Sequence, residues 1–285
     1  MNKRLRNIVV AVIVLFCLAA AALYHVATSA PPQAVPVLNY HQINDRDNNA
    51  LTVHTDQFEK QMKYLHDNGY TTITPAEMMD AWQNGTPLPE KPVIITFDDG
   101  YIDNYKNAYP VLQKYNLRAT IFLISDYLGV YPNYLTWSEA ADMQESGLID
   151  FESHTLSHME LSEEKAGSKA EIKKQLEDSK AAIEWHLKKN INFIAYPCGT
   201  YDEEVEQMTK DAGYRAAFTV NYGLAEPSNN PFVLDRVPIF GCNSHTYARF
   251  VARLKYAPLV APLERYRANL VKGGHTLLAR FIPNP

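Results

Sequence analysis

Short apolar runs alternate with helix-like segments along most of this chain, and no other feature constrains the fold as strongly. In one such segment Phe58, Met62 and Leu65 recur at helical spacing, and Gly69 marks the stop. Alternation of this kind predicts a parallel sheet wrapped by helices, with the recurring apolar residues in the core. We expect strands at 35–38, 92–96, 119–124, 149–151, 193–196 and 216–219, and helices at 56–68, 105–115, 138–145, 163–189 and 203–211.

The helix expected at 163–189 has two different faces. Ile172, Leu176, Ser179 and Ile183 form one stripe, and Lys and Glu cover the rest, as expected of the outer helix of a barrel. We interpret the charged face as solvated, and the segment 84–89, Asn-Gly-Thr-Pro-Leu-Pro, as a surface loop.

Length, composition and charge bound the class of protein. The 285 residues, 46% of them hydrophobic, can bury a sizeable core, and one large domain is the simplest organisation. The formal net charge is -5, and basic residues are not concentrated outside the extreme N-terminus, so we expect no nucleic-acid partner. We also expect a monomer.

The N-terminus has the features of an export signal. The basic stretch 3–6, Lys-Arg-Leu-Arg, precedes an uninterrupted apolar run at 8–23. Pro31 and Pro32 would directly follow a cleavage site at Ala30, which favours an uncleaved single-pass membrane anchor over a cleaved signal peptide. We therefore expect a transmembrane or signal helix within residues 1–30. The rest of the chain would lie outside the cytoplasm, at the cell membrane or, after cleavage, secreted.

Only two of the three cysteines lie beyond the apolar run. Cys17 falls inside it, whereas Cys198 and Cys242 would both face an oxidising compartment. The sequence permits a disulfide between these two without requiring one. It contains no cysteine cluster of the kind that binds zinc.

Three polar clusters follow predicted strands: 96–101 (Thr-Phe-Asp-Asp-Gly-Tyr), 154–158 (His-Thr-Leu-Ser-His) and 196–199 (Tyr-Pro-Cys-Gly). The carboxyl ends of parallel strands share one rim, so these groups can converge there. Two acids in one pocket favour a cation or a proton, and an imidazole pair would complete a three-ligand metal site. Each motif alone has a simpler explanation, which is a turn or helix cap for the acids and a surface pair for the histidines.

Motif by motif, these residues resemble the nodulation-protein-type polysaccharide deacetylases, a family that includes chitin, peptidoglycan and exopolysaccharide deacetylases and acetylxylan esterases. The resemblance covers residues 35–240. It implies that Asp98 is the general base and that Asp99, His154 and His158 bind one divalent metal ion. A carboxylate and two imidazoles suit Zn²⁺ first, with Co²⁺, Ni²⁺ or Fe²⁺ as alternatives.

The third cluster resembles a family motif that supplies an oxyanion donor, and the resemblance assigns this role to the backbone N–H of Cys198. The chain departs from the family here in two ways. It has no arginine just before Pro197, and an aromatic residue is more usual where Cys198 stands. Arg236 is the candidate for the missing arginine, because a guanidinium at a later strand end can pair bidentately with the base and orient it.

The family's final histidine motif is not recognisable after residue 240, but the segment 37–41, Val-Leu-Asn-Tyr-His, offers a replacement. It resembles the opening of the circularly permuted branch that includes the poly-β-1,6-N-acetylglucosamine deacetylases. His41 is therefore the candidate general acid, because an imidazole with a pKa of about 6.5 can donate a proton near neutral pH. A histidine satisfied by neighbours at a strand end is the alternative. Aromatic candidates for substrate contact are Tyr101, Tyr196 and Trp137, with Tyr131, Tyr134 and Tyr201 as further sugar-stacking choices.

The resemblance implies an α/β fold, a deformed (β/α) barrel of about seven parallel strands. We expect the catalytic domain at 31–245 and a C-terminal extension at 246–285 whose role is not legible. The predicted function is metal-dependent removal of N-acetyl groups from an N-acetylglucosamine-containing cell-surface or extracellular polysaccharide, with release of acetate. The alternatives are an O-acetyl esterase of the acetylxylan type and an inactive carbohydrate-binding envelope protein.

Overall fold

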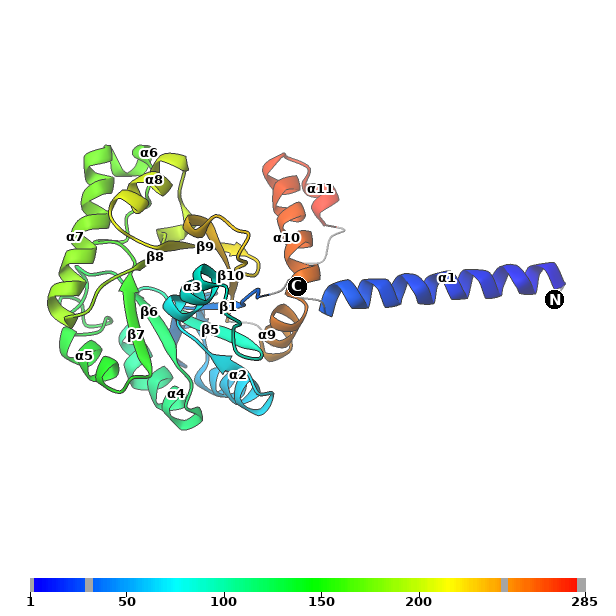
Figure 1. The fold of residues 1–285 in the computed structure, drawn as a ribbon, viewed down its shortest axis with the longest axis horizontal. Coiled ribbons are helices and arrows are strands. Elements are labelled where there is room, and N and C mark those ends of the chain that lie inside the picture. The colour runs from blue at the N-terminus through cyan, green and yellow to red at the C-terminus, as the bar shows by residue number, and fades with distance from the viewer. Residues whose placement is uncertain (1–2, 29–32, 242–245, 281–285) are drawn as a thin grey trace. The chain divides into compact units, whose positions relative to one another are not determined.

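The computed structural model describes residues 3–28, 33–241 and 246–280, and the chain divides into two compact units, residues 33–250 and residues 1–32 with 251–285. The larger unit is a closed barrel of seven parallel strands, in which β1 pairs with both β5 and β10. The predicted (β/α) barrel is therefore confirmed (Figure 1). Its strands are β1 (Val37–Tyr40), β5 (Pro92–Phe97), β6 (Ala119–Leu123), β7 (Ile149–Ser153), β8 (Phe193–Ala195), β9 (Ala216–Tyr222) and β10 (Leu234–Pro238).

The strands of the barrel are buried on both faces, which is why they appear in the sequence as near-continuous apolar runs. The residues of β1 are all buried, and so are those of β6. Parallel register brings their carboxyl ends together: Tyr40 of β1 lies opposite Phe97 of β5, and Leu123 of β6 lies opposite Ser153 of β7. The residues that follow these strands therefore share one rim of the barrel.

The helices of this unit lie outside the strands, as Figure 1 shows for α2, α4, α5 and α7. The single helix predicted at 163–189 is wrong in one respect, because the structure breaks it into two. Gly167 ends the first part in the left-handed region at φ 76°, and the Ser168 side chain caps the second part by accepting from the Glu171 amide. The helices are α2 (Thr55–Asp67), α3 (Pro75–Asn84), α4 (Tyr109–Tyr115), α5 (Trp137–Glu145), α6 (Glu163–Ala166), α7 (Lys169–Leu187) and α8 (Glu203–Asp211).

Shorter elements complete the unit. β4 (Thr71–Thr72) adds to the first residues of β5, and β2 (Gln42–Ile43) pairs with β3 (Thr52–Val53) in a separate two-stranded sheet. A π-helical turn at Asn104–Ala108 leads directly into α4. Two short 3₁₀ turns follow β8 and precede β10, at Pro197–Gly199 and Pro231–Val233.

Sequence periodicity did not predict α3, although its start carries a clear signal. The Thr74 side chain accepts from the Glu77 amide, and the Glu77 side chain accepts from the Thr74 amide, which is a capping box. Met78 and Met79 of α3 then join one core cluster with strand residues such as Phe122 and Phe218. The helix ends at Asn84, the first residue of the segment 84–89. Gly85 caps the helix in the left-handed conformation.

The smaller unit is helical. It contains α1 (Lys3–Thr28), α10 (Ala257–Lys272) and α11 (Thr276–Ala279), and α9 (Thr246–Lys255) crosses the boundary between the units. Among the described residues, no helix combines the length and the apolar character needed to cross a membrane. The predicted N-terminal anchor is thus unconfirmed. Cys242, with which the sequence permits Cys198 to form a disulfide, lies outside the described residues.

Candidate active site

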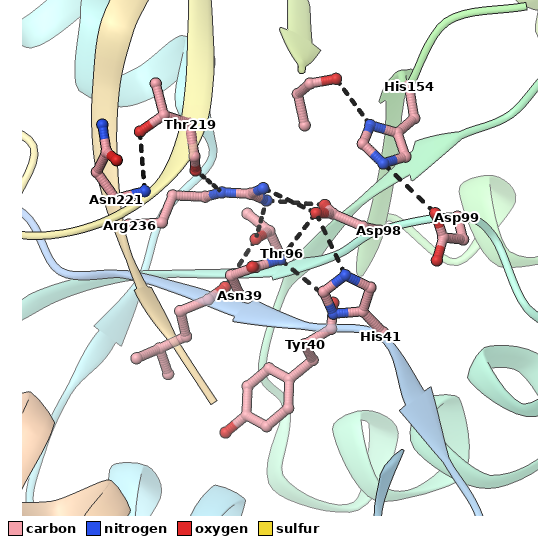
Figure 2. Close-up of polar contacts among 12 residues, drawn as sticks. Asn39, Tyr40, His41, Thr96, Asp98, Asp99, His154, Thr219, Asn221 and Arg236 are labelled. Atoms are coloured by element: carbon pink, nitrogen blue, oxygen red, sulfur yellow. Dashed lines mark hydrogen bonds and ion pairs between the residues drawn. The ribbon is translucent and has the colours of Figure 1, made fainter. Parts of the chain in front are cut away.

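The predicted polar clusters meet at the carboxyl-terminal rim of the barrel. Asp98 and Asp99 directly follow β5, and His154 directly follows β7. The 3₁₀ turn with Cys198 comes one residue after the end of β8, and Arg236 lies within β10. The side chains of Asp98, Asp99, His154 and Arg236 lie side by side in Figure 2.

Asp99, His154 and His158 form a metal-type triad. The Nε2 atoms of both histidines lie 3.4 Å from Asp99 Oδ1, and one potential ligand atom from each residue falls within 4.8 Å of the others. Asp99 Oδ1 is buried and has no hydrogen-bond partner among the described residues. A buried carboxylate oxygen without a partner costs free energy unless a cation or a proton satisfies it.

The orientation of His154 also fits metal binding. Its Nδ1 atom lies 2.7 Å from the carbonyl oxygen of Ala195, which is the usual way to fix a tautomer that presents Nε2 as a ligand. Burial lowers the pKa of His154, but the negative charges of Asp98 and Asp99 outweigh it and raise the pKa. The pocket therefore favours a positive charge beside Asp99, and one carboxylate with two imidazoles is a donor set that binds divalent transition ions.

The loop that carries His158 is held in an unusual conformation. Thr155 and His158 both adopt positive φ values, 70° and 60°, which are uncommon for residues other than glycine. The His158 amide donates to Thr155 Oγ1 at 3.1 Å, and the Ser157 amide donates to Oε1 of the buried Gln175 of α7 at 3.0 Å. These bonds allow the His-x₃-His spacing to bring both rings to the same carboxylate.

Asp98 points away from the triad into a buried ion pair, as Figure 2 shows. Two nitrogens of Arg236 donate to its two oxygens at 2.7 Å each, and Asn39 Nδ2 donates to Oδ2 at 2.9 Å. Burial alone would raise the pKa of Asp98, but the charges of Arg236 and His154 hold it well below its usual range. Asp98 is therefore an ionised acceptor at neutral pH.

Arg236 is itself fully buried and fixed by the barrel wall. Its Nε atom donates to the carbonyl oxygen of Thr219 at 2.8 Å, and one terminal nitrogen contacts Thr96 Oγ1 at 3.3 Å. Sequence reasoning proposed the pairing of Arg236 with Asp98, and the structure brings them together. Sequence reasoning missed the contact between Asn39 and Asp98. A polar residue inside the wholly buried strand Val37–Tyr40 was a signal that could have revealed it.

His41 lies at the same rim, one residue after β1. Its Nε2 atom is 3.9 Å from Asp98 Oδ2, and 16% of its side chain is exposed. Burial lowers the pKa of His41, and the charges of Asp98 and Asp99 oppose that shift without cancelling it. The ring thus lies next to the predicted base and retains access to solvent.

The Cys198 turn follows the strand that anchors His154. Cys198 adopts φ 55°, and the two hydrogen bonds of the turn are donated by the amides of Gly199 and Thr200, so neither uses the Cys198 N–H. The thiol forms no disulfide with the described residues, and burial together with the charge of Glu160 raises its pKa, which disfavours a reactive thiolate.

The three aromatic candidates differ in position. Tyr101 is partly buried, and burial and the negative charge of Asp99 raise the pKa of its hydroxyl. Tyr196 has no exposed surface, so its predicted contact with substrate is wrong: its ring stacks on Tyr201 within the protein. Trp137 stacks face to face on His186 of α7, with ring centroids 4.1 Å apart, so one face of its ring is covered by protein.

Comparison with known proteins identifies the family. The family model described as polysaccharide deacetylase matches residues 85–217. The deacetylase-family protein YxkH of Bacillus subtilis is 36% identical over 225 residues, which are 79% of this chain and 78% of the relative. This chain belongs to the polysaccharide deacetylase family.

Two further relatives refine this assignment. A poly-β-1,6-N-acetyl-D-glucosamine N-deacetylase of Staphylococcus aureus is 30% identical over 225 residues, 71% of this chain and 77% of that protein. The structure of the Streptococcus pyogenes deacetylase PplD in complex with acetate superposes with a TM-score of 0.70, at 30% identity over 77% of this chain and 98% of that one. The predicted family and its permuted branch are confirmed, and the protein is a hydrolase of the polysaccharide deacetylase family.

Proposed function

We propose that this protein is a metal-dependent deacetylase that removes N-acetyl groups from an N-acetylglucosamine polymer, with a β-1,6-linked chain as the preferred substrate. One observation carries the proposal. Asp98, buried and paired bidentately with Arg236, lies beside a triad in which a buried oxygen of Asp99, without a hydrogen-bond partner among the described residues, faces two imidazoles. The linkage preference is supported by the similarity to the staphylococcal enzyme that acts on the β-1,6-linked polymer.

Asp99, His154 and His158 would hold the metal, with Zn²⁺ as our first choice. A divalent ion in this triad would polarise the acetamide carbonyl and lower the pKa of a bound water. Asp98 accepts a proton from the attacking water. The two hydrogen bonds from the Arg236 guanidinium keep the Asp98 carboxylate charged and correctly oriented. The Cys198 N–H donates to the carbonyl oxygen as negative charge develops there.

His41 completes the scheme as the general acid that protonates the leaving nitrogen. The proposal rests on its position 3.9 Å from Asp98 and its partial exposure. An amide nitrogen leaves poorly without a proton, whereas an activated ester does not need one. We therefore expect His41→Ala to lower kcat by about 100-fold on an acetylated amino sugar and much less on an activated acetyl ester. Equal losses on both would assign His41 a structural role.

We also propose that the N-terminal segment directs export and anchors the chain, so that the barrel acts outside the cytoplasm. The basic stretch at 3–6 and the apolar run at 8–23 support this. Apolar side chains of α1, including Phe16 and Leu18, are exposed. Fractionation of expressing cells, with and without alkaline extraction of membranes, distinguishes an anchored chain from a secreted one.

The decisive experiment measures acetate release by the full chain from β-1,6- and β-1,4-linked N-acetylglucosamine oligomers, after chelation and after adding back Zn²⁺, Co²⁺ or Ni²⁺. We expect chelation to abolish release, metal to restore it, and the β-1,6 oligomers to react fastest. Cleavage of acetylxylan alone would indicate an esterase instead. Absence of turnover on every substrate, together with oligomer binding, would indicate a carbohydrate-binding protein.

A further inference from the structure

Four tyrosines form an aromatic cluster beside the metal-type triad. Tyr134 stacks on Tyr101 with ring centroids 5.0 Å apart, and Tyr127 meets both Tyr134 and Tyr131 edge-on at 4.9 and 5.0 Å. We call Tyr101, Tyr127, Tyr131 and Tyr134 the tyrosine cluster. Three of its members belong to the segment between β6 and α5, and none of those three has a role in the scheme above.

The cluster is tied to both segments that carry metal-type ligands. Leu135 donates its amide to the carbonyl oxygen of Gly100 at 2.9 Å, next to Asp99, and Tyr101 and Tyr134 form an antiparallel bridge. On the other side, the Tyr127 hydroxyl donates to the carbonyl oxygen of Ser157 at 3.3 Å, next to His158. The segment with the tyrosines therefore bridges the Asp99 turn and the His158 loop, and its rings have a defined position relative to the triad.

The cluster is not closed to solvent. Tyr101, Tyr127 and Tyr134 are partly buried, but 51% of Tyr131 and 66% of the adjacent Val130 are exposed. A cluster that served only the core would bury its outermost ring, because each exposed aromatic face leaves apolar area in water. Tyr131 thus presents an exposed aromatic surface with a phenol hydroxyl on the outer side of the cluster, next to Tyr127 and Tyr134.

We propose that the tyrosine cluster, with Tyr131 outermost, binds a pyranose unit of the polysaccharide adjacent to the unit that is deacetylated. This inference rests on the proposed function. A pyranose ring of N-acetylglucosamine carries axial C–H groups on its faces, which pack on an aromatic ring, and its hydroxyls can hydrogen-bond to phenol groups. An extended polymer whose acetyl group reaches the triad must also pass residues that adjoin the triad. The segment that carries the cluster is hydrogen-bonded both to the Asp99 turn and to the His158 loop.

The test compares Tyr131→Ala and Tyr131→Phe with a matched control, Trp185→Ala, which removes a more exposed aromatic, 71% accessible, from α7. We would measure kcat/KM for acetate release from N-acetylglucosamine dimers to hexamers with the full chain. Tyr131→Ala should lower the ratio of hexamer to dimer kcat/KM about tenfold, mainly through KM, whereas Tyr131→Phe should retain most of it and Trp185→Ala all of it. An unchanged ratio in Tyr131→Ala would overturn the inference, as would equal losses at every length.

A binding measurement keeps this inference distinct from the proposed function. Hexamer affinity is measured by calorimetry for the Asp98→Asn variant with and without Tyr131→Ala, and an approximately tenfold weakening is expected even if no oligomer is turned over. If wild type releases no acetate but Tyr131→Ala weakens hexamer binding, the proposed function fails and the subsite stands. If Tyr131→Ala instead reduces binding to lipid vesicles and leaves hexamer affinity unchanged, the exposed ring is a membrane contact and the inference is wrong.

Discussion

Two bidentate arginine–carboxylate pairs lie at opposite ends of this barrel and differ mainly in burial. At the carboxyl end Arg236 donates two hydrogen bonds of 2.7 Å to the Asp98 carboxylate, and both side chains are at most 2% exposed. At the amino end Arg118 donates two hydrogen bonds of 2.9 and 2.7 Å to the Glu77 carboxylate. The Arg118 side chain is 33% exposed and that of Glu77 is 47% exposed. The same chemistry therefore occurs once where water is excluded and once where it is present.

The difference shows that geometry alone does not make a pair functional. Burial opposes ionisation of both carboxylates, and in each case the arginine reverses this and lowers the pKa. For Asp98 the charge is maintained inside the protein, beside the Asp99, His154 and His158 triad, where the proposed general base must lie. For Glu77 solvent screens the pair, and the carboxylate serves α3 by capping its first turn.

The largest expected contrast is in turnover. Asp98→Asn should lower kcat for acetate release at least about 10³-fold, because an amide cannot accept the proton that the attacking water loses. Glu77→Gln makes the same chemical change at the other end and should leave kcat within about twofold of wild type. Both variants should bind Zn²⁺ with wild-type affinity, measured by competition with a chromophoric chelator. Full activity in Asp98→Asn would exclude Asp98 as the base.

Removing each arginine should separate the two pairs by stability. Arg236→Met leaves Asp98 buried and unpaired, so the free energy of unfolding should fall by about 3–5 kcal/mol. Arg118→Met should cost only about 1 kcal/mol, since water can solvate Glu77. Urea unfolding with chelator present, which eliminates any contribution from bound metal, measures both values. Similar losses at the two ends would show that burial is not the deciding difference.

Exchanging each arginine for lysine separates the effect of the bidentate hydrogen bonds from the effect of the positive charge. Lysine retains a positive charge but cannot donate two parallel bonds to one carboxylate. We expect Arg236→Lys to lower kcat by about tenfold, because Asp98 loses its fixed orientation, with little change in KM. Arg118→Lys should leave kcat unaltered. A purely electrostatic role for Arg236 predicts wild-type kcat in the lysine variant.

The smallest expected effect is a pH dependence at the exposed pair. Because the pKa of Glu77 is lower in the folded than in the unfolded chain, the folded state binds fewer protons. The stabilisation is therefore complete above the unfolded pKa of about 4.3 and disappears as pH falls through the folded value. Glu77→Gln, which can still cap α3, should be less stable than wild type by under about 1 kcal/mol at pH 7 and equally stable near pH 3. A difference that grows on acidification would contradict this assignment.

Much of the barrel was predictable because its signals are local. Buried parallel strands appear as apolar runs, and helix stops such as Gly69 can be recognised without tertiary information. The errors also have local causes: Gly167 and Ser168 interrupt one helix, and the capping box at Thr74 marks another that hydrophobic periodicity did not reveal. Tyr196 was assigned to the substrate, but its aromatic character did not indicate that the ring is buried.

The sequence by itself determined which residues could form the site. Side chains that follow parallel strands share one rim of the barrel, so this topology requires Asp98, Asp99 and His154 to lie close together. Only the tertiary structure decided how they divide their roles. The positive φ of Asp99, 76°, turns its carboxylate toward the histidines. Pairing of β1 with β5 and with β10 brings to Asp98 both Asn39, 59 residues away, and Arg236, 138 residues away. Burial and long-range pairing set these contacts, and neither is a property of a local stretch of sequence.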